Sequence, residues 1–431
     1  MGGKRILLRG GELVLPDRIV KDGIVLVDGD SIAFAGEAVS FLKRYGVKAW
    51  AAGAMKLTRT LGLSEIFDLE KRIVVPALVE AHIHGAAGYD FETPGDSLGD
   101  TFDEDREFED FERFVSFLSS KGVGIFVPTV VFEEGVIERI TRIIRHYYSK
   151  ESRVRRRIPG IYIEGPFISR EKRGGIRDEY IVGFSEKVFE RIYSLSSGLL
   201  KVMTFAPEVK GAEELIRVLV KRGVVPSLGH SDCSLAEIED VVGKNPTDRG
   251  VIYNVTHLFN GMSGLSHKTP GLAHWALLED SVYTELNCDE THVHPLALKL
   301  AFKLKPLEKI IMISDANSAS GCDDSADFRR SPPLLRGRKL YVEGNGVYDM
   351  ETKTLVGSRL LVKDSIKRVV DNYSISPVDV VKMASLNALR MLGISDRGEL
   401  REGMKADISV FDQDFKECFL QIFEGNVTFQ K

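Results

Sequence analysis

The sequence predicts an α/β protein built on a (β/α)8 barrel of the TIM type, with a small β-sandwich-like domain formed by both chain termini. Short apolar runs alternate with segments of helical periodicity, as is typical of a parallel sheet covered by helices on both faces. Eight such runs occur, the number that closes a barrel. The segments before and after them contain short strands with glycine and aspartate at the turns.

The eight apolar runs are the predicted barrel strands. They occupy residues 73–84, 123–131, 158–165, 200–208, 223–231, 251–260, 282–289 and 309–318. Between them, segments such as 105–122 and 133–150 repeat apolar residues about every 3.6 positions, as amphipathic helices do. An open doubly wound sheet is the alternative, but no glycine-rich phosphate loop follows the early runs, and this favours the barrel.

The domain boundaries are placed where this alternation begins and ends. Residues 1–72 and 395–431 are predicted to form one composite β domain, and residues 73–394 the barrel. Residues 37–66 change to a partly helical character and are interpreted as an insertion packed on the sheet. A second interruption, residues 319–362, contains a predicted hairpin after the eighth run.

Composition and charge narrow the possible functions. The net charge is −5 and the basic residues are spread out, so nothing indicates a nucleic-acid partner. The four cysteines form no C-x-x-C pair, which argues against a disulfide framework and a cysteine zinc finger. The N-terminal apolar run is too short for a signal peptide, and no stretch approaches the length of a transmembrane helix. We therefore expect a cytoplasmic protein with no membrane partner.

Metal-ligand residue types gather near the ends of five predicted strands. They are His82 and His84, Glu164, His230, His257 and Asp315. The first two are two residues apart, so on a strand they point to the same side. Because the carboxyl ends of barrel strands surround one cavity, we expect all six side chains to converge there. Each residue alone fits a structural hydrogen bond as well, but their coincidence favours a metal site.

The ligand types indicate the chemistry of such a site. Imidazoles and carboxylates bind Zn²⁺ or Fe²⁺. A divalent metal lowers the pKa of bound water to roughly 7 and polarises a carbonyl. Asp315 could take the proton from that water and hand it to a leaving amine. If both His82 and His84 bind, a second ion fits, with Glu164 as the bridging carboxylate. The prediction is metal-assisted hydrolysis of an amide-like bond with one or two divalent ions.

Motifs spread along nearly the whole chain carry a family resemblance. They include VVPALVEAHIHGAAGYDFE, IYIEGPFIS, LGHSD, THLFNGM, MISDANSASG and LREGMKADISVFD. The chain resembles the amidohydrolase superfamily and, within it, the N-acetylglucosamine-6-phosphate deacetylases. The resemblance implies a barrel with a β domain from both termini, usually as a homodimer. It also implies metal ligation by Glu164, His230 and His257, with Asp315 as general acid/base. Family members that keep both H-x-H histidines bind two metals, so His82 and His84 imply a site for two.

The substrate positions partly depart from the family pattern. Ile176 stands where the family commonly has a histidine that contacts the acyl carbonyl, so polarisation would rest on metal alone or on another donor such as Arg177. Lys268 aligns with a phosphate-binding arginine, and lysine lacks the bidentate fork of arginine.

The remaining substrate positions match the family pattern, and together with the metal residues they lead to the function hypotheses. The resemblance places the backbone of Asn260 and Gly261 in the phosphate pocket and implies that His292 reaches the phosphate of the neighbouring subunit. The leading hypothesis is removal of acetate from an N-acetylated amino sugar phosphate, N-acetylglucosamine-6-phosphate. The alternative is the same metal core acting on another amide: an unphosphorylated or galacto N-acetyl sugar, an N-acyl amino acid or a cyclic amide. A non-catalytic barrel is a third reading, which the presence of all six ligand-type residues disfavours.

Overall fold

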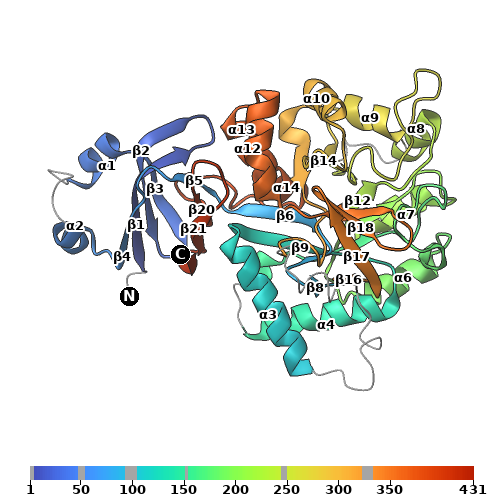
Figure 1. Cartoon of the computed structure of the whole chain (residues 1–431), viewed down its shortest axis with the longest axis horizontal. Coiled ribbons are helices and arrows are strands. Elements are labelled where there is room, and N and C mark those ends of the chain that lie inside the picture. The colour runs from blue at the N-terminus through green and yellow to red at the C-terminus, as the bar shows by residue number, and fades with distance from the viewer. Residues whose placement is uncertain (1–3, 47–53, 93–103, 151–153, 244–249, 323–332) are drawn as a thin grey trace. The chain divides into compact units, whose positions relative to one another are not determined.

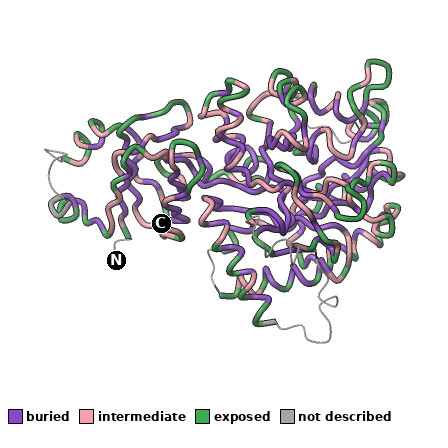
Figure 2. Tube along the Cα trace, in the orientation of Figure 1, coloured by how far each residue is buried: buried purple, intermediate pink, exposed green. Residues whose placement is uncertain are grey.

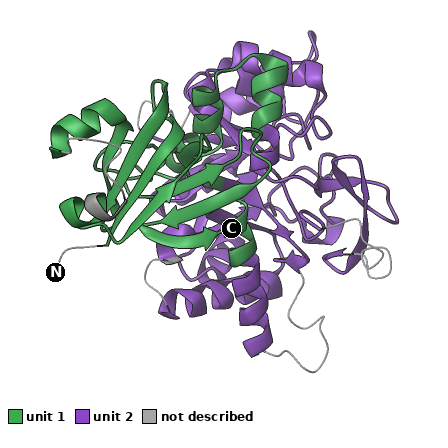
Figure 3. Cartoon of the chain, turned by 60° about the vertical axis from the view of Figure 1, so that its left-hand side comes forward, with its two compact units in different colours: residues 1–79, 115–124, 366–431 green, residues 80–114, 125–365 purple. Residues whose placement is uncertain are grey.

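The computed structural model describes residues 4–46, 54–92, 104–150, 154–243, 250–322 and 333–431 (Figure 1). The chain divides into two compact units (Figure 3). The first comprises residues 1–79, 115–124 and 366–431, and the second residues 80–114 and 125–365. The predicted boundaries after residues 72 and 394 stay predictions. Residues 47–53 of the segment 37–66, and 323–332 of the segment 319–362, lie outside the described residues.

The first unit contains an eight-stranded sheet made from both ends of the chain. Its order is β22 (Asn426–Gln430), β21 (Cys418–Phe423), β20 (Ile408–Phe411), β5 (Ile73–Pro76), β1 (Arg5–Val14), β2 (Ile19–Asp28) and β3 (Ser31–Glu37), with β4 (Glu65–Asp68) beside β1. The two chain ends meet where β20 runs antiparallel to β5, with Val410 opposite Val74. Both valines are fully buried. The predicted terminal β domain is thereby confirmed.

Two short helices from the segment 37–66 pack on this sheet. They are α1 (Ala38–Tyr45) and α2 (Ala54–Leu61). Phe41, Leu57 and Leu61 belong to one buried cluster with Leu7 and Ile24 of the sheet. Leu57 and Leu61 are four residues apart and therefore share one helix face.

The second unit is organised around eight parallel strands that form a nearly closed barrel. In sheet order they are β15 (Ile310–Ile313), β14 (Tyr283–Asn287), β13 (Asn254–Val255), β12 (Val225–Leu228), β11 (Leu200–Phe205), β10 (Ile161–Glu164), β9 (Val123–Val131) and β6 (Leu78–Ile83). Backbone bonds close the gap between the first and last strands: His84 N donates to Ala316 O at 2.7 Å and Asp315 N to His82 O at 3.3 Å. Each predicted run contains one barrel strand, and the first run also contains β5 of the terminal sheet. The predicted barrel is confirmed.

Helices alternate with the strands of this unit, and the strands themselves are buried (Figure 2). The helices are α3 (Glu104–Ser120), α4 (Glu134–Lys150), α5 (Val154–Arg157), α6 (Glu186–Leu195), α7 (Ala212–Lys221), α8 (Leu235–Gly243), α9 (Leu272–Leu278) and α10 (Pro295–Leu304). In α7, Leu215, Ile216 and Leu219 are buried while Glu214 and Arg217 are exposed, as the helical spacing of apolar residues requires. Among the described residues, none of the helices has the length and apolarity needed to cross a membrane.

A small antiparallel sheet follows the eighth barrel strand. It consists of β16 (Leu334–Leu335), β17 (Arg338–Glu343), β18 (Gly346–Asp349) and β19 (Leu355–Ser358). Its central hairpin turns at Gly344, which has the left-handed φ of 60° that glycine accommodates without strain. The predicted hairpin is confirmed, and its sheet supplies one wall of the cavity described next.

Candidate metal centre

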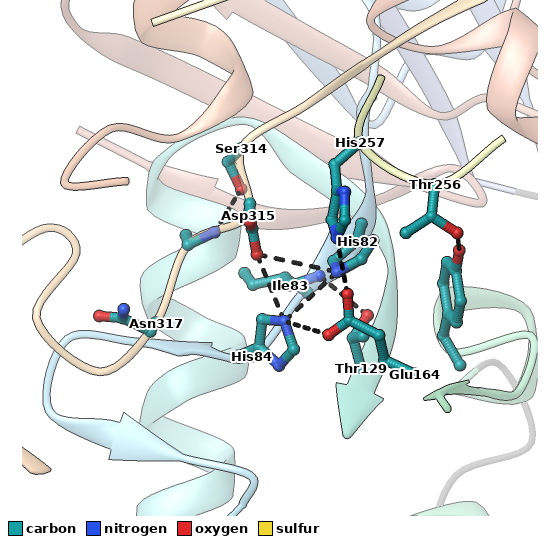
Figure 4. Close-up of polar contacts among 12 residues, drawn as sticks. His82, Ile83, His84, Thr129, Glu164, Thr256, His257, Ser314, Asp315 and Asn317 are labelled. Carbon is teal, nitrogen blue, oxygen red and sulfur yellow. Dashed lines mark hydrogen bonds and ion pairs between the residues drawn. The ribbon is translucent and has the colours of Figure 1, made fainter. Parts of the chain in front are cut away.

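The six predicted metal and acid/base residues lie together at the carboxyl ends of the barrel strands, and Figure 4 shows five of them with their side chains directed toward one another. Glu164 is the central residue. Its Oε1 lies 2.7 Å from Nε2 of His257 and 2.8 Å from Nε2 of His230. Its Oε2 lies 3.6 Å from Nε2 of His84. His82 completes the cluster, with its Nε2 3.3 Å from that of His84.

These side chains form two groups whose ligand atoms are close enough to hold a metal ion. One group is His82, His84 and Glu164, and the other is Glu164, His230 and His257. All five residues are buried. Because Glu164 belongs to both groups and offers one oxygen to each side, the arrangement suits a carboxylate bridging two ions.

Three of the residues lie just beyond their strands, in turns with unusual backbone angles. His230, His257 and Asp315 have φ values of 47°, 26° and 56°. For residues other than glycine this region costs about 1–3 kcal/mol, a strain that is concentrated at functional sites. The strands are shorter than the predicted runs because these last residues belong to the turns that aim the side chains inward.

The hydrogen-bond partners of the histidine rings indicate which ring nitrogen carries the proton, and the resulting arrangement fits a cation between the rings. Nδ1 of His230 lies 2.8 Å from the Lys172 carbonyl oxygen, which can only accept, so Nδ1 carries the proton. In the neutral ring Nε2 then presents a lone pair to Glu164 and to Nε2 of His257, 3.1 Å away. Nδ1 of His82 likewise donates to Glu285 at 3.0 Å, which turns its lone pair toward His84. Converging lone pairs repel unless a proton or metal ion lies among them, so the residues present fit a divalent metal.

Electrostatics keep the two central carboxylates ionised. Burial alone raises the pKa of Glu164. Without metal, the charge and hydrogen bonds of protonated imidazoles at His230 and His257, which a cation would replace, lower it well below its ordinary value. Burial also raises the pKa of Asp315, and its contacts with His84, His82 and His292 outweigh this and lower it. An ionised Asp315 can accept a proton at neutral pH.

A cavity of about 160 Å³ opens beside these ligands. Of the predicted residues, those that line it are His84, Glu164, His230, His257, Asn260, Gly261, His292 and Asp315. Its lining also includes the apolar side chains of Ile176, Leu335 and Val356. His292 faces Asp315 of its own chain, with Nε2 3.7 Å from Oδ2, and is held by Asp289 through Nδ1 at 2.7 Å.

Two predicted substrate residues do not line this cavity. Arg177 is half exposed and pairs with Glu179 at 3.3 Å. Lys268 is exposed and borders a separate hollow that also includes Lys172 and Asp232. Neither side chain lines the cavity beside the candidate metal ligands.

Sequence reasoning missed four charged residues around the ligands: Glu80, Glu92, Glu285 and Arg336. All four are buried. A signal existed for Glu80 and Glu285, because each is an acidic residue inside an otherwise apolar strand and is costly to bury without a partner. No such signal existed for Glu92 and Arg336, which pair across 244 positions of the chain.

Glu80 gives the folded protein a pH dependence that can be measured. Its Oε2 accepts a hydrogen bond from Ser314 Oγ at 2.6 Å and its Oε1 from Val362 N at 2.8 Å. Burial nevertheless raises its pKa from 4.5 to about 7. The folded protein therefore holds this proton more tightly than the unfolded chain. The resulting stabilisation is full below pH 4.5 and is lost as the pH rises through about 7.

We expect Glu80→Gln to remove this pH dependence, because the amide does not titrate. At 1.36 kcal/mol per pKa unit, the wild-type free energy of unfolding should fall by about 2–3 kcal/mol more than that of the variant between about pH 5 and 8. Urea denaturation of both metal-free proteins measures the difference. The same pH slope in both would contradict the assignment.

The fold and site together define a class of protein: a barrel hydrolase that depends on divalent metal. The sequence matches the Amidohydrolase family model over residues 73–429, and the chain belongs to that family. A relative from Bacillus subtilis (strain 168), an N-acetylglucosamine-6-phosphate deacetylase, is 31% identical over 362 residues, covering 83% of this chain and 85% of that protein. The predicted family resemblance is thereby confirmed.

Two further comparisons bear on fold and substrate. An N-acetylgalactosamine-6-phosphate deacetylase from Escherichia coli O157:H7 is 27% identical over 350 residues, covering 80% of this chain and 85% of that protein. The crystal structure of an N-acetylglucosamine-6-phosphate deacetylase from Thermotoga maritima superposes with a TM-score of 0.77 at 28% identity. That superposition covers 99% of this chain and 100% of the other, so the two folds correspond throughout.

Proposed function

We propose that this chain hydrolyses the N-acetyl group of an amino sugar phosphate, converting N-acetylglucosamine-6-phosphate to glucosamine-6-phosphate and acetate. The enzyme is then a hydrolase of carbon–nitrogen bonds other than peptide bonds. The observation that carries the proposal is the carboxylate of Glu164 shared between two ligand groups, with Asp315 beside His84 and lining the same cavity. The names of the relatives support the substrate.

The roles of the residues follow from their positions. Glu164, His230 and His257 would hold one ion and His82, His84 and Glu164 a second, with Zn²⁺ or Fe²⁺ suited to these ligands. Bound divalent ions polarise the acyl carbonyl and lower the pKa of water. Asp315 accepts a proton from the attacking water and delivers it to the amide nitrogen, so that the amine can leave.

We assign the phosphate end of the substrate to Asn260, Gly261 and His292, which line the same cavity as the ligands. His292 is oriented by Asp289. Arg177 and Lys268 do not line this cavity, although Arg177 Nη2 donates at 3.4 Å to the carbonyl oxygen of Arg336, which does. The homodimer that we propose rests on the family resemblance.

A second candidate function is hydrolysis of a different amide by the same metal core. The apolar side chain of Ile176 in the cavity wall and the position of Lys268 outside it favour this alternative. Within the amino sugars, the Escherichia coli relative makes the galacto epimer a candidate as well.

Acetate release by metal-reconstituted protein tests the proposal. The substrates to compare are N-acetylglucosamine-6-phosphate, its galacto epimer and unphosphorylated N-acetylglucosamine. We expect turnover of a 6-phosphate and at least tenfold lower kcat/KM without it, since His292 and the backbone of Asn260 and Gly261 have no anion to bind in the free sugar. If metal-loaded protein released acetate from none of them, the substrate assignment would be wrong and other N-acyl and cyclic amides would be screened.

A further inference from the structure

Glu92 is a fully buried carboxylate that no step of the proposed mechanism uses. Its two oxygens accept from Arg336, with Nε–Oε2 at 2.9 Å and Nη2–Oε1 at 2.7 Å. Oε1 also accepts from the backbone N of Val131 at 2.7 Å. Oε2 lies 3.3 Å from Nδ1 of His84. Glu92 thus joins a buried arginine directly to one of the candidate metal ligands.

Arg336 fixes the position of this carboxylate. It lies in the turn between β16 and β17, and its Nη1 donates to the Gly175 carbonyl oxygen at 3.3 Å. Its backbone N donates to Asp90 Oδ2 at 3.2 Å. Arg336 lines the cavity and is buried. The guanidinium thus holds both oxygens of Glu92 in a bidentate pair within the protein interior.

The two candidate metal positions differ in the groups behind their histidines. His82 Nδ1 is hydrogen-bonded to the buried carboxylate of Glu285 at 3.0 Å. His84 Nδ1 lies at ion-pair distance, 3.3 Å, from the buried carboxylate of Glu92 and has no other polar partner among the described residues. His230 has only a backbone carbonyl oxygen there. A carboxylate at Nδ1 fixes the tautomer, turns the Nε2 lone pair inward and makes the imidazole a stronger ligand. The H-x-H position therefore depends on these carboxylates in a way that the other position does not.

We propose that Glu92, held by Arg336, is the positioning residue that makes the group of His82, His84 and Glu164 a metal position. Occupancy of this position then depends on the turn between β16 and β17, while the position of Glu164, His230 and His257 does not. The inference rests on the proposed metal-dependent function, but it concerns metal binding and can be tested without substrate.

The test compares zinc binding by wild type and Glu92→Gln. Both proteins are stripped of metal and equilibrated at graded free Zn²⁺ set by a chelator, and bound metal is counted by mass spectrometry. We expect two equivalents in the wild type. In the variant we expect one equivalent with an unchanged dissociation constant and the other weakened about 10- to 100-fold, the usual effect of losing such a partner.

Because Glu92→Gln leaves Arg336 buried without its partner, a second variant guards against misfolding. The double variant Glu92→Gln/Arg336→Met buries no unpaired charge and should show the same selective loss. Glu424→Gln is the matched control, since it breaks a buried glutamate–arginine pair at 2.9 Å in the other unit. It should bind both equivalents as the wild type does.

A double-mutant comparison shows whether Glu92 acts through His84. In an His84→Asn background, Glu92→Gln should cause no further change in zinc binding. Two equivalents with wild-type constants in both Glu92 variants, or equal weakening of both equivalents, would overturn the proposal. If one zinc equivalent were selectively weakened but the wild-type protein hydrolysed no amino sugar, the proposal about Glu92 would hold and the proposed substrate would be wrong.

Discussion

Replacing Glu164 with glutamine is expected to abolish binding of both divalent ions at concentrations that saturate the wild type. Its Oε1 lies 2.7 and 2.8 Å from two histidine nitrogens, and its Oε2 faces His84 at 3.6 Å. Glutamine removes the negative charge and one of the two oxygens, so neither ligand group stays complete. Because metal contributes several kcal/mol to such hydrolysis, kcat/KM should fall by about 10³-fold or more.

Glu164 belongs to both ligand groups, so the control variant changes a residue that belongs to only one of them. His84→Asn should lose one equivalent and keep the other, since only one of the two groups contains His84. Zinc titration of the metal-free proteins, followed by acetate assays of the loaded ones, measures both effects. If Glu164→Gln kept one equivalent at wild-type affinity, the two groups would not share this carboxylate.

Much of the barrel and of its candidate metal centre could be predicted because both follow local rules. An apolar run shows where a barrel strand lies, and the residues at its carboxyl end must face the common cavity. That rule placed His230 correctly even though β12 ends at Leu228, two residues earlier. The predicted runs are longer than the observed strands. The last residues of a run are apolar or small whether they pair with a neighbouring strand or form the turn, so the sequence does not show where the strand ends.

The substrate side could be predicted less well, because it depends on contacts between distant segments. The pair of Arg336 and Glu92 has no periodicity that would reveal it, and each residue alone reads as a solvated charge in a loop. The resemblance named Lys268 by alignment, and Arg177 was proposed as a donor because it follows the aligned position of Ile176. Neither argument fixes where a loop directs its side chain. In the structure Arg177 turns to Glu179, and Lys268 lies outside the cavity.

Replacing Asp315 with asparagine is expected to lower kcat by about 10²- to 10⁴-fold, the usual contribution of general acid–base catalysis. The Oδ1 of Asp315 lies 3.3 Å from Nε2 of His84, and its Oδ2 lies 3.7 Å from Nε2 of His292. It therefore contacts a candidate metal ligand through one oxygen and His292, a proposed substrate residue, through the other. Asparagine keeps the shape but cannot accept and return a proton. Zinc content should stay at two equivalents, because Asp315 belongs to neither ligand group.

The pH profile separates this role from a structural one. The contacts that lower the pKa of Asp315 keep it ionised through the neutral range, so wild-type kcat should fall only in acid, as the carboxylate becomes protonated. The residual rate of Asp315→Asn should lack that acid limb, because no carboxylate titrates. The exposed Asp17→Asn, which breaks only a surface pair with Arg18, is the matched control and should keep the wild-type profile. An Asp315→Asn protein with full zinc and a kcat within about tenfold of wild type would require another proton carrier, and His292 would be the first to test.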